Sequence, residues 1–373
     1  MSVYRHKISS FWLCYFFIRL FYLLFATQIF ARLTTLGDTE WYLAGGQRPF
    51  SLMTFHNSTY FMHFFGGVIG AIFRRNLLLS SIPAMLISFF ITKWVIEKLE
   101  LRKRVNNVFL MAMISLPNFS IWTSVWSKEV FGLVFSSIIV VTIINFLNGK
   151  YEIKIIDIVG MYICLVFKPQ YLPFILQGLI FIYIAREYMN RKTIEQVILG
   201  LTILLTNILF LYIIRDTVNM YAGRMHGYFV FYGAGTRENI FLEDYDFFRH
   251  LPRGMFVAFF GPTLGEMRDS PLHVIAGIES LSIIFLFLYL LKYTYADGFF
   301  NFRFSPVVTI SYLIIFIGIC FIHYPFGIFN PGAAIRYRTN FIFLFIVLLL
   351  YLYGQRQKYY LIGKKLRLRT QKG

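Results

Sequence analysis

Two arginines stand shortly before a long apolar segment near the end of the chain. Arg336 and Arg338 follow a Pro-Gly pair at 331–332 and precede the apolar run 341–353. An arginine costs about 2.5 to 3.5 kcal/mol at the centre of a helix in lipid, so this pair needs an explanation. One explanation is snorkelling into the lipid headgroups. The other is bidentate binding of phosphate, with the Pro-Gly pair supplying irregular backbone of the kind that lines membrane cavities.

Acidic and basic side chains also occur in the polar segments between earlier apolar runs. Asp38 and Glu40 follow the first run, and Lys128 and Glu129 precede a later one. A carboxylate can deprotonate a hydroxyl nucleophile or ligate a divalent cation. Asp38 follows a glycine, so it also suits a turn or a helix N-cap. Lys128 and Glu129 equally suit a plain helix start, and Lys168 lies at a Pro-containing interruption of another run.

The composition is that of a polytopic membrane protein. Of 373 residues, 58% are hydrophobic and only 14% are charged, which excludes a soluble domain of this length. The net charge of +18 does not indicate nucleic acid, because the basic residues lie between the apolar runs. The three cysteines lie inside apolar runs and form no disulfide or zinc pattern: Cys14, Cys164 and Cys320.

The apolar runs predict an all-α protein of about ten transmembrane helices. The first run, 8–31, has no small-residue cleavage site after it and carries Arg19 in its middle, so we expect a retained span. The run 60–73 is short against the 20 residues that a span needs, which predicts an interfacial helix. The other expected spans are 77–96, 108–126 with a break at 116–118, 130–147, two within 155–185, 194–214, 272–291, 306–322 and 341–353.

The basic residues predict the orientation of these spans. Of 36 lysines and arginines, 21 fall on the side of the two termini and 14 on the other, where 6 belong to the long polar segment 215–271. The positive-inside rule therefore puts both termini on the cytoplasmic side of the membrane. We expect one transmembrane domain over 1–373, with a first extracytoplasmic loop at 32–76, a long extracytoplasmic loop at 215–271 and a basic cytoplasmic tail at 354–373. Asp38, Lys128, Lys168, Arg336 and Arg338 then share the extracytoplasmic face.

Several short motifs occur in an order that points to a known class of proteins. The first is Gly37, Asp38, Thr39, Glu40, Trp41 and Tyr42. The second is Leu116, Pro117 and Asn118, leading to Trp126, Ser127, Lys128 and Glu129. The third is Leu251, Pro252, Arg253 and Gly254, followed by Phe260, Gly261 and Pro262. The last is Asn330, Gly332, Arg336 and Arg338. In this set the chain resembles the GT-C class of integral-membrane glycosyltransferases, in particular those of bacterial envelope polysaccharide assembly, such as O-antigen and capsule polymerases.

The resemblance implies a GT-C-like fold and a division of roles. Asp38, with Glu40 as its rival, would be the catalytic acid of the first extracytoplasmic loop. Arg336 and Arg338 would neutralise the phosphate of a donor sugar carried on an undecaprenyl lipid, because the leaving phosphate gains charge as the glycosidic carbon becomes oxocarbenium-like. The remaining expected substrate contacts are Lys128, Glu129, Lys168, Tyr42 and Arg253.

The expected function is therefore glycosyl transfer onto a surface polysaccharide, either as the polymerase of repeat units or with single sugars. Its partners would be the lipid-linked donor and acceptor, membrane lipids and other proteins of polysaccharide assembly. The residues indicate no particular cofactor, and Mg²⁺ or Mn²⁺ held by the acid is the alternative to base catalysis. A flippase or transporter of lipid-linked glycans is the competing function. The chain shows no internal repeat of the kind that transporters have.

Overall fold

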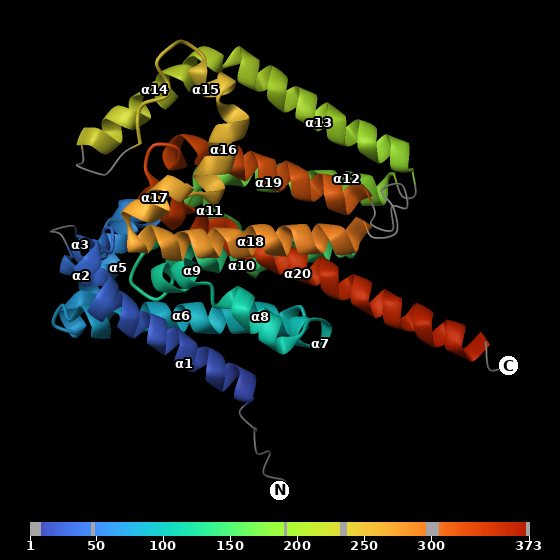
Figure 1. Cartoon of the computed structure of the whole chain (residues 1–373), viewed down its shortest axis with the longest axis horizontal. Helices are drawn as coiled ribbons and strands as arrows, with labels where there is room; N and C mark the ends of the chain where they lie inside the picture. Colours follow the sequence, from blue (N-terminus) through green and yellow to red (C-terminus); the bar gives the residue numbers. More distant parts are fainter. Residues whose placement is uncertain (1–8, 46–48, 190–191, 232–236, 296–305, 371–373) are drawn as a thin grey trace, which may run out of the picture. The chain divides into compact units, whose positions relative to one another are not determined.

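The computed structural model describes residues 9–45, 49–189, 192–231, 237–295 and 306–370 (Figure 1). Within these ranges the chain is helical and has no β-strand. Its internal contacts divide it into two compact units. Unit 1 comprises Met1–Val141 and Thr339–Gly373, and unit 2 comprises Thr142–Arg338, so the boundaries fall inside two long helices.

Unit 1 contains the N-terminal helices and most of the last helix. Asparagine side chains cap three of its helices: Asn57 before α5, Asn76 before α6 and Asn106 before α8. Each accepts backbone N–H groups that a helix start leaves without an intrahelical partner. The helices are α1 (Ser10–Phe25), a π-helical turn (Ala26–Phe30), α2 (Ala31–Leu33), α3 (Thr39–Ala44), α4 (Met53–His56), α5 (Ser58–Ile72), α6 (Leu77–Lys98), α7 (Leu101–Arg104), α8 (Asn107–Ile114), α9 (Pro117–Trp122), α10 (Lys128–Leu147) and α20 (Pro331–Thr370).

Unit 2 contains the central helices, and the long polar segment is mostly helical. Helix α19 packs along α12 and α16, so it forms the centre of this unit (Figure 1). The helices are α11 (Ile155–Phe167), a 3₁₀ turn (Pro169–Tyr171), α12 (Leu172–Glu187), α13 (Thr193–Ile213), α14 (Arg215–Phe231), α15 (Asp246–Arg249), α16 (Leu251–Phe260), α17 (Leu264–Asp269), α18 (Pro271–Tyr295) and α19 (Pro306–Gly327).

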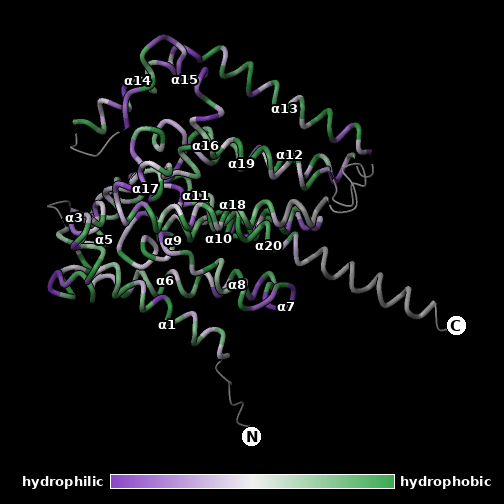
Figure 2. Tube along the Cα trace, viewed as in Figure 1, coloured by the Kyte–Doolittle hydropathy of each residue, from purple (hydrophilic) through white to green (hydrophobic). Residues whose placement is uncertain are grey.

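The helices support a polytopic membrane protein, but the expected number of about ten spans is not confirmed. Among the described residues, seven helices are long and apolar enough to cross a membrane, or up to eight if one bent pair counts as a span. The seven segments are Ser10–Leu33, Leu77–Lys98, Lys128–Leu147, Thr193–Ile213, Pro271–Tyr289, Pro306–Gly327 and Pro331–Gly354. Figure 2 shows the apolar character of these helices, for example along α13.

Two breaks account for the difference in number. The segment expected to span at 108–126 is divided into α8 and α9, with 8 and 6 residues, because Pro117 begins a new helix. The segment 155–185 forms the bent pair, in which the chain bends by 118° between Ile155–Phe167 and Pro169–Glu187, at Lys168. The short apolar run expected at the interface is α5, which has 15 residues.

The last helix begins earlier than expected. Pro331 is its first residue, and the Asn330 side chain accepts the N–H of Ala333 at 2.8 Å. The expectation that the pair Pro331 and Gly332 supplies irregular backbone is therefore wrong, because both residues lie in the first turn of α20. Proline is well suited to the first position of a helix, where no N–H is needed. The break falls before it, at 328–330.

Candidate functional site

The first candidate cluster lies in unit 1, where α3 packs very closely on α5. A Cβ atom added to Gly70 would lie 2.1 Å from the carbonyl oxygen of Leu43, and one added to Gly66 would lie 2.7 Å from that of Tyr42. Only glycine allows two helices to approach to this distance. The glycines of α5 therefore fix the position of the short helix that carries Tyr42 and begins after Asp38.

Asp38, Tyr42 and Lys128 come together on this scaffold. The Tyr42 hydroxyl donates to Asp38 Oδ2 at 3.2 Å, and Lys128 Nζ lies 5.9 Å from the centre of the Tyr42 ring. Asp38 and Lys128 are half-buried, whereas Tyr42 is buried. The cluster thus combines a carboxylate, a phenol and an ammonium group at a partly accessible position.

The loop before α10 holds Lys128 in this place. Lys128 Nζ donates to Thr59 Oγ1 of α5 at 2.8 Å, and Trp126 Nε1 donates to the carbonyl of Met62 at 3.3 Å. Trp126 is buried, so it packs within unit 1. The loop is therefore attached to the same helix as α3.

A buried arginine of the first span supports the other end of this loop. Arg19 is fully buried, and its guanidinium donates to the hydroxyl and the carbonyl oxygen of Thr123 at 2.9 and 2.6 Å. Thr123 is the C-cap of α9, where helix carbonyls carry partial negative charge. The Ser88 hydroxyl of α6 donates to the same carbonyl. Three elements of unit 1 thus meet at one residue of the loop.

The other acidic candidates of unit 1 differ in exposure. Glu40 is exposed in the first turn of α3, and Glu129 is buried in the first turn of α10. The structure adds His63 of α5, which the sequence did not single out. Its ring is fully buried and lies edge-on to Trp41 and Tyr42, with ring centres 3.9 and 5.1 Å apart. A single histidine in an apolar run carries no spacing signal that would have identified it.

The second candidate cluster lies in unit 2 at the break between α11 and α12. Lys168 is the C-cap of α11, and its Nζ lies 4.3 Å from the centre of the Tyr337 ring. The guanidinium carbon of Arg336 lies 5.9 Å from the same ring. Both cations are half-buried. Two positive charges therefore share one aromatic ring on α20.

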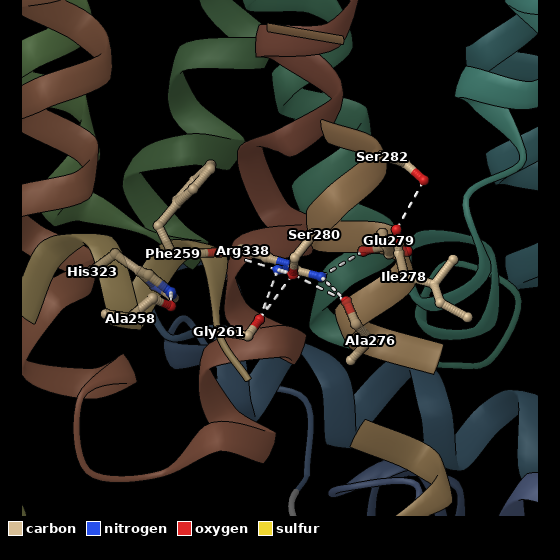
Figure 3. A network of polar contacts seen from close by, with 10 residues as sticks. All are labelled: Ala258, Phe259, Gly261, Ala276, Ile278, Glu279, Ser280, Ser282, His323 and Arg338. Carbon is tan, nitrogen blue, oxygen red and sulfur yellow. Dashed lines mark hydrogen bonds and ion pairs between the residues drawn. The ribbon is translucent and has the colours of Figure 1, made fainter. Parts of the chain in front are cut away.

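Arg338 has different surroundings from Arg336 and belongs to the polar network drawn in Figure 3. It is 1% exposed and forms an ion pair with the equally buried Glu279 of α18, with a distance of 3.0 Å between Nη2 and Oε1. Its guanidinium also donates to Ser280 Oγ and to three carbonyl oxygens, those of Phe259, Gly261 and Ala276. Arg338 thus joins α20 to α18 and to the end of α16.

The helical backbone explains why the two arginines separate. Residues i and i+2 of an α-helix point about 200° apart, so they do not face one ligand together. The expectation that both forks hold the same phosphate assumed irregular backbone, which the structure does not have. The geometry leaves Arg336 as the candidate phosphate contact and gives Arg338 a positioning role. Arg253 is exposed on α16.

A further arginine positions the turn that leads into α20. Arg237 forms two hydrogen bonds with the carboxylate of Glu266 on α17, and its Nη1 donates to the carbonyls of Gly327 and Ile328, both at 2.9 Å. Burial acts most strongly and raises the pKa of Glu266, but hydrogen bonds from Arg237 and Thr263 outweigh it. The pKa of Glu266 is therefore held below its usual value.

Acid should weaken this contact. A carboxyl whose pKa is lowered by folding stabilises the protein above its unfolded pKa of about 4.3 and loses that contribution as the pH falls through the folded value. We expect Glu266→Gln to lower the stability at pH 7 by about 1 kcal/mol and to flatten the loss of stability between about pH 4.5 and 3. Thermal unfolding in detergent across this pH range measures both. Glu238→Gln, an exposed acid of the same segment, is the control and should change neither.

Neither a comparison with known proteins nor a search for metal-binding groups assigns a further role to these residues. No family model, curated protein or solved structure matches this chain. In the ranges that the structure describes, no three His, Cys, Asp or Glu side chains form a group that would hold a metal ion.

Proposed function

We propose that this chain is an inner-membrane glycosyltransferase that works on the extracytoplasmic side. It takes a sugar or oligosaccharide from a polyprenyl-(pyro)phosphate carrier and transfers it to a growing surface polysaccharide. The observation that carries the proposal is the contact of Asp38 with Tyr42 beside Lys128. The carboxylate lies in a membrane protein at a partly accessible position, close to a fixed cation.

Each group of this cluster has a chemical task in glycosyl transfer. Asp38 accepts the proton of the acceptor hydroxyl as that oxygen attacks the anomeric carbon. The Tyr42 hydroxyl holds one carboxylate oxygen, which leaves the other oriented for the proton transfer. Lys128 stabilises negative charge that develops nearby, an effect that is large in a water-poor site. The glycosidic bond to phosphate breaks, and the phosphate leaves as an anion.

The second cluster suits the phosphate of the donor. Lys168 and Arg336 lie near the same Tyr337 ring, and two like charges in a site of low dielectric repel each other. A phosphate dianion relieves this repulsion and accepts hydrogen bonds from both groups. Lys168 supplies a point charge and Arg336 a planar fork.

The experiment that tests the proposal uses the purified chain in proteoliposomes with a lipid-linked sugar donor. We expect a new glycosidic product and release of the polyprenyl phosphate. Movement of the donor between leaflets without new bonds would instead establish the flippase. If lipid-linked donor and acceptor mixtures from polysaccharide-producing bacteria give neither a new product nor movement of the donor between leaflets, both functions are contradicted.

The arginine near Tyr337 should be sensitive to a change that keeps its charge. Arg336→Lys removes the fork but not the cation, and we expect transfer to fall by about tenfold, the value of one charge-assisted hydrogen bond. Initial rates over a range of donor concentrations measure the loss. Arg224→Lys, at an exposed position of α14, should leave the rate unchanged. Equal rates for Arg336→Lys and wild type would return Arg336 to a snorkelling role.

A further inference from the structure

A second group of cations lies in unit 1 at the end away from α3. The first turn of α1 carries Phe11 and Trp12, and α6 ends at Lys98. Helix α7 follows α6 and is hydrophilic, as Figure 2 shows. Three cations of this end contact aromatic rings: Lys93, Arg102 and Arg104. By the positive-inside rule this is the cytoplasmic end.

Aromatic rings hold these cations in place. The guanidinium carbon of Arg102 lies 4.7 Å from the centre of the Phe11 ring and 5.9 Å from that of Trp12. Lys93 Nζ lies 6.0 Å from the same Trp12 ring. Arg104 lies 5.1 Å from the ring of Tyr351 on α20. A snorkelling side chain extends into water, whereas these three are gathered over rings and are only half-exposed.

Three hydrogen-bond donors of this cluster point to an anion. Trp12 is 6% exposed, and its Nε1 is buried and forms no hydrogen bond within the described part of the chain. The same holds for Arg102 Nε and Arg104 Nη1. Buried donors are normally paired, because leaving one unpaired costs free energy. A negatively charged group with several oxygens would accept hydrogen bonds from indole and guanidinium donors of this kind.

The chain itself supplies little negative charge at this end. Glu100 forms an ion pair with Lys103, and Glu97 is exposed. The flanking sequences 1–8 and 355–373 contain no aspartate or glutamate and add further lysines and arginines. The described residues form no ion pair with Lys93, Arg102 or Arg104 that would neutralise them. The described part of the chain therefore supplies no ion-pair partner for these three cations.

We propose that this cluster binds the phosphate of an anionic phospholipid in the cytoplasmic leaflet. The cations and the Trp12 N–H contact the headgroup phosphate, and the acyl chains lie on apolar surface beside it. Leu13 and Phe90 provide such surface, with 47% and 59% exposure, next to Trp12 and one turn from Lys93. Basic pockets between membrane helices on this side are known to suit anionic headgroups. This apolar border favours a lipid over a soluble phosphate.

The test uses the full chain in detergent micelles with added lipid. We expect phosphatidylglycerol to raise the thermal unfolding midpoint and phosphatidylcholine to leave it unchanged at the same molar fraction. Native mass spectrometry gives the apparent affinity for phosphatidylglycerol. Inorganic phosphate and glycerol phosphate should give no comparable protection at the same concentration. A wild-type chain without a preference for phosphatidylglycerol, or one protected equally by inorganic phosphate, overturns the proposal.

A matched pair of variants distinguishes specific phosphate binding by Arg102 from non-specific attraction of anionic lipid to the positive charge of α7. Arg102→Gln should weaken phosphatidylglycerol binding at least about tenfold, because it removes a charge-assisted contact to phosphate. Lys103→Gln removes the same charge from the next residue of α7, but its amine is paired with Glu100 and 74% exposed, so binding should stay within about twofold. Equal losses for both variants overturn the proposal.

A milder variant guards against misfolding of Arg102→Gln. Trp12→Phe keeps an aromatic ring for the cations and removes only the indole N–H. We expect it to weaken phosphatidylglycerol binding several-fold with little change in the unfolding midpoint measured without that lipid. Arg102→Lys keeps the charge of Arg102 and removes its planar fork. If Trp12→Phe and a folded Arg102→Lys chain both bind phosphatidylglycerol as tightly as the wild type, the Trp12 N–H and the Arg102 fork do not contact the phosphate.

Discussion

Asp38→Asn should abolish glycosyl transfer in proteoliposomes. The substitution keeps the volume of the side chain and can still accept the hydrogen bond from Tyr42, but it removes the group that accepts the proton. General base catalysis contributes about 10²- to 10⁴-fold to a rate, so we expect a loss of at least about a hundredfold in turnover. The measurement is the initial rate of product formation at saturating donor, normalised to the amount of folded protein.

Two control variants test which acid of α3 is involved. Glu40→Gln changes an exposed acid two residues away and should retain nearly the wild-type rate. Tyr42→Phe removes the hydroxyl that holds Asp38 and should give an intermediate loss. A dead Glu40→Gln enzyme beside an active Asp38→Asn enzyme would move the base to Glu40 and keep the mechanism.

Arg338→Met should destabilise the protein more than any surface change. The substitution leaves Glu279 buried without its counter-charge, and breaking a buried ion pair in this way costs about 3 to 5 kcal/mol. Equilibrium unfolding in mixed micelles measures the change. This loss differs from that of Arg336→Lys, which should affect the transfer rate and leave the unfolding midpoint in place.

A double variant distinguishes the ion pair from simple loss of packing. Replacing Arg338 and Glu279 together by methionine removes both charges, and apolar replacements of buried ion pairs are often tolerated. We therefore expect the double variant to recover much of the stability that the single variant loses. If Arg338→Met alone costs less than about 1 kcal/mol, Arg338 does not act as the buried link that its contacts describe.

The apolar runs predicted most of the long helices. In lipid, backbone N–H and C=O groups find no water, so they form hydrogen bonds with each other, as they do in a helix. The spans expected at 77–96 and 194–214 correspond to α6 (Leu77–Lys98) and α13 (Thr193–Ile213) within a few residues. The break at Pro117 was also predicted, since proline ends the hydrogen-bond ladder of a preceding helix. The expectation that each broken or bent run still crosses the membrane is not confirmed, because the helices in these runs are too short by themselves.

The pairing of buried charges could not be predicted from local sequence. Arg338 pairs with a glutamate 59 residues away, and this contact depends on how α18 and α20 pack. One signal was present: Glu279 is a single carboxylate in an apolar run, and such a residue normally has a partner. The approach of α3 to α5 through Gly66 and Gly70 is likewise a property of packing: their G-x-x-x-G spacing indicates a close helix contact but does not identify the partner.

The contact between Arg19 and Thr123 has a consequence for the biogenesis of the protein. Helix α1 enters the membrane with a charge near its middle, but its hydrogen-bond acceptor follows 104 residues later. At about 5 to 20 residues per second, synthesis takes on the order of 5 to 20 seconds to reach it. During that interval the guanidinium must draw on water or headgroups, which holds the helix at a shallow or tilted depth. We therefore expect helix α1 to reach its final position only after α9 has been made, so its placement depends on packing within unit 1 as well as on its own apolar residues.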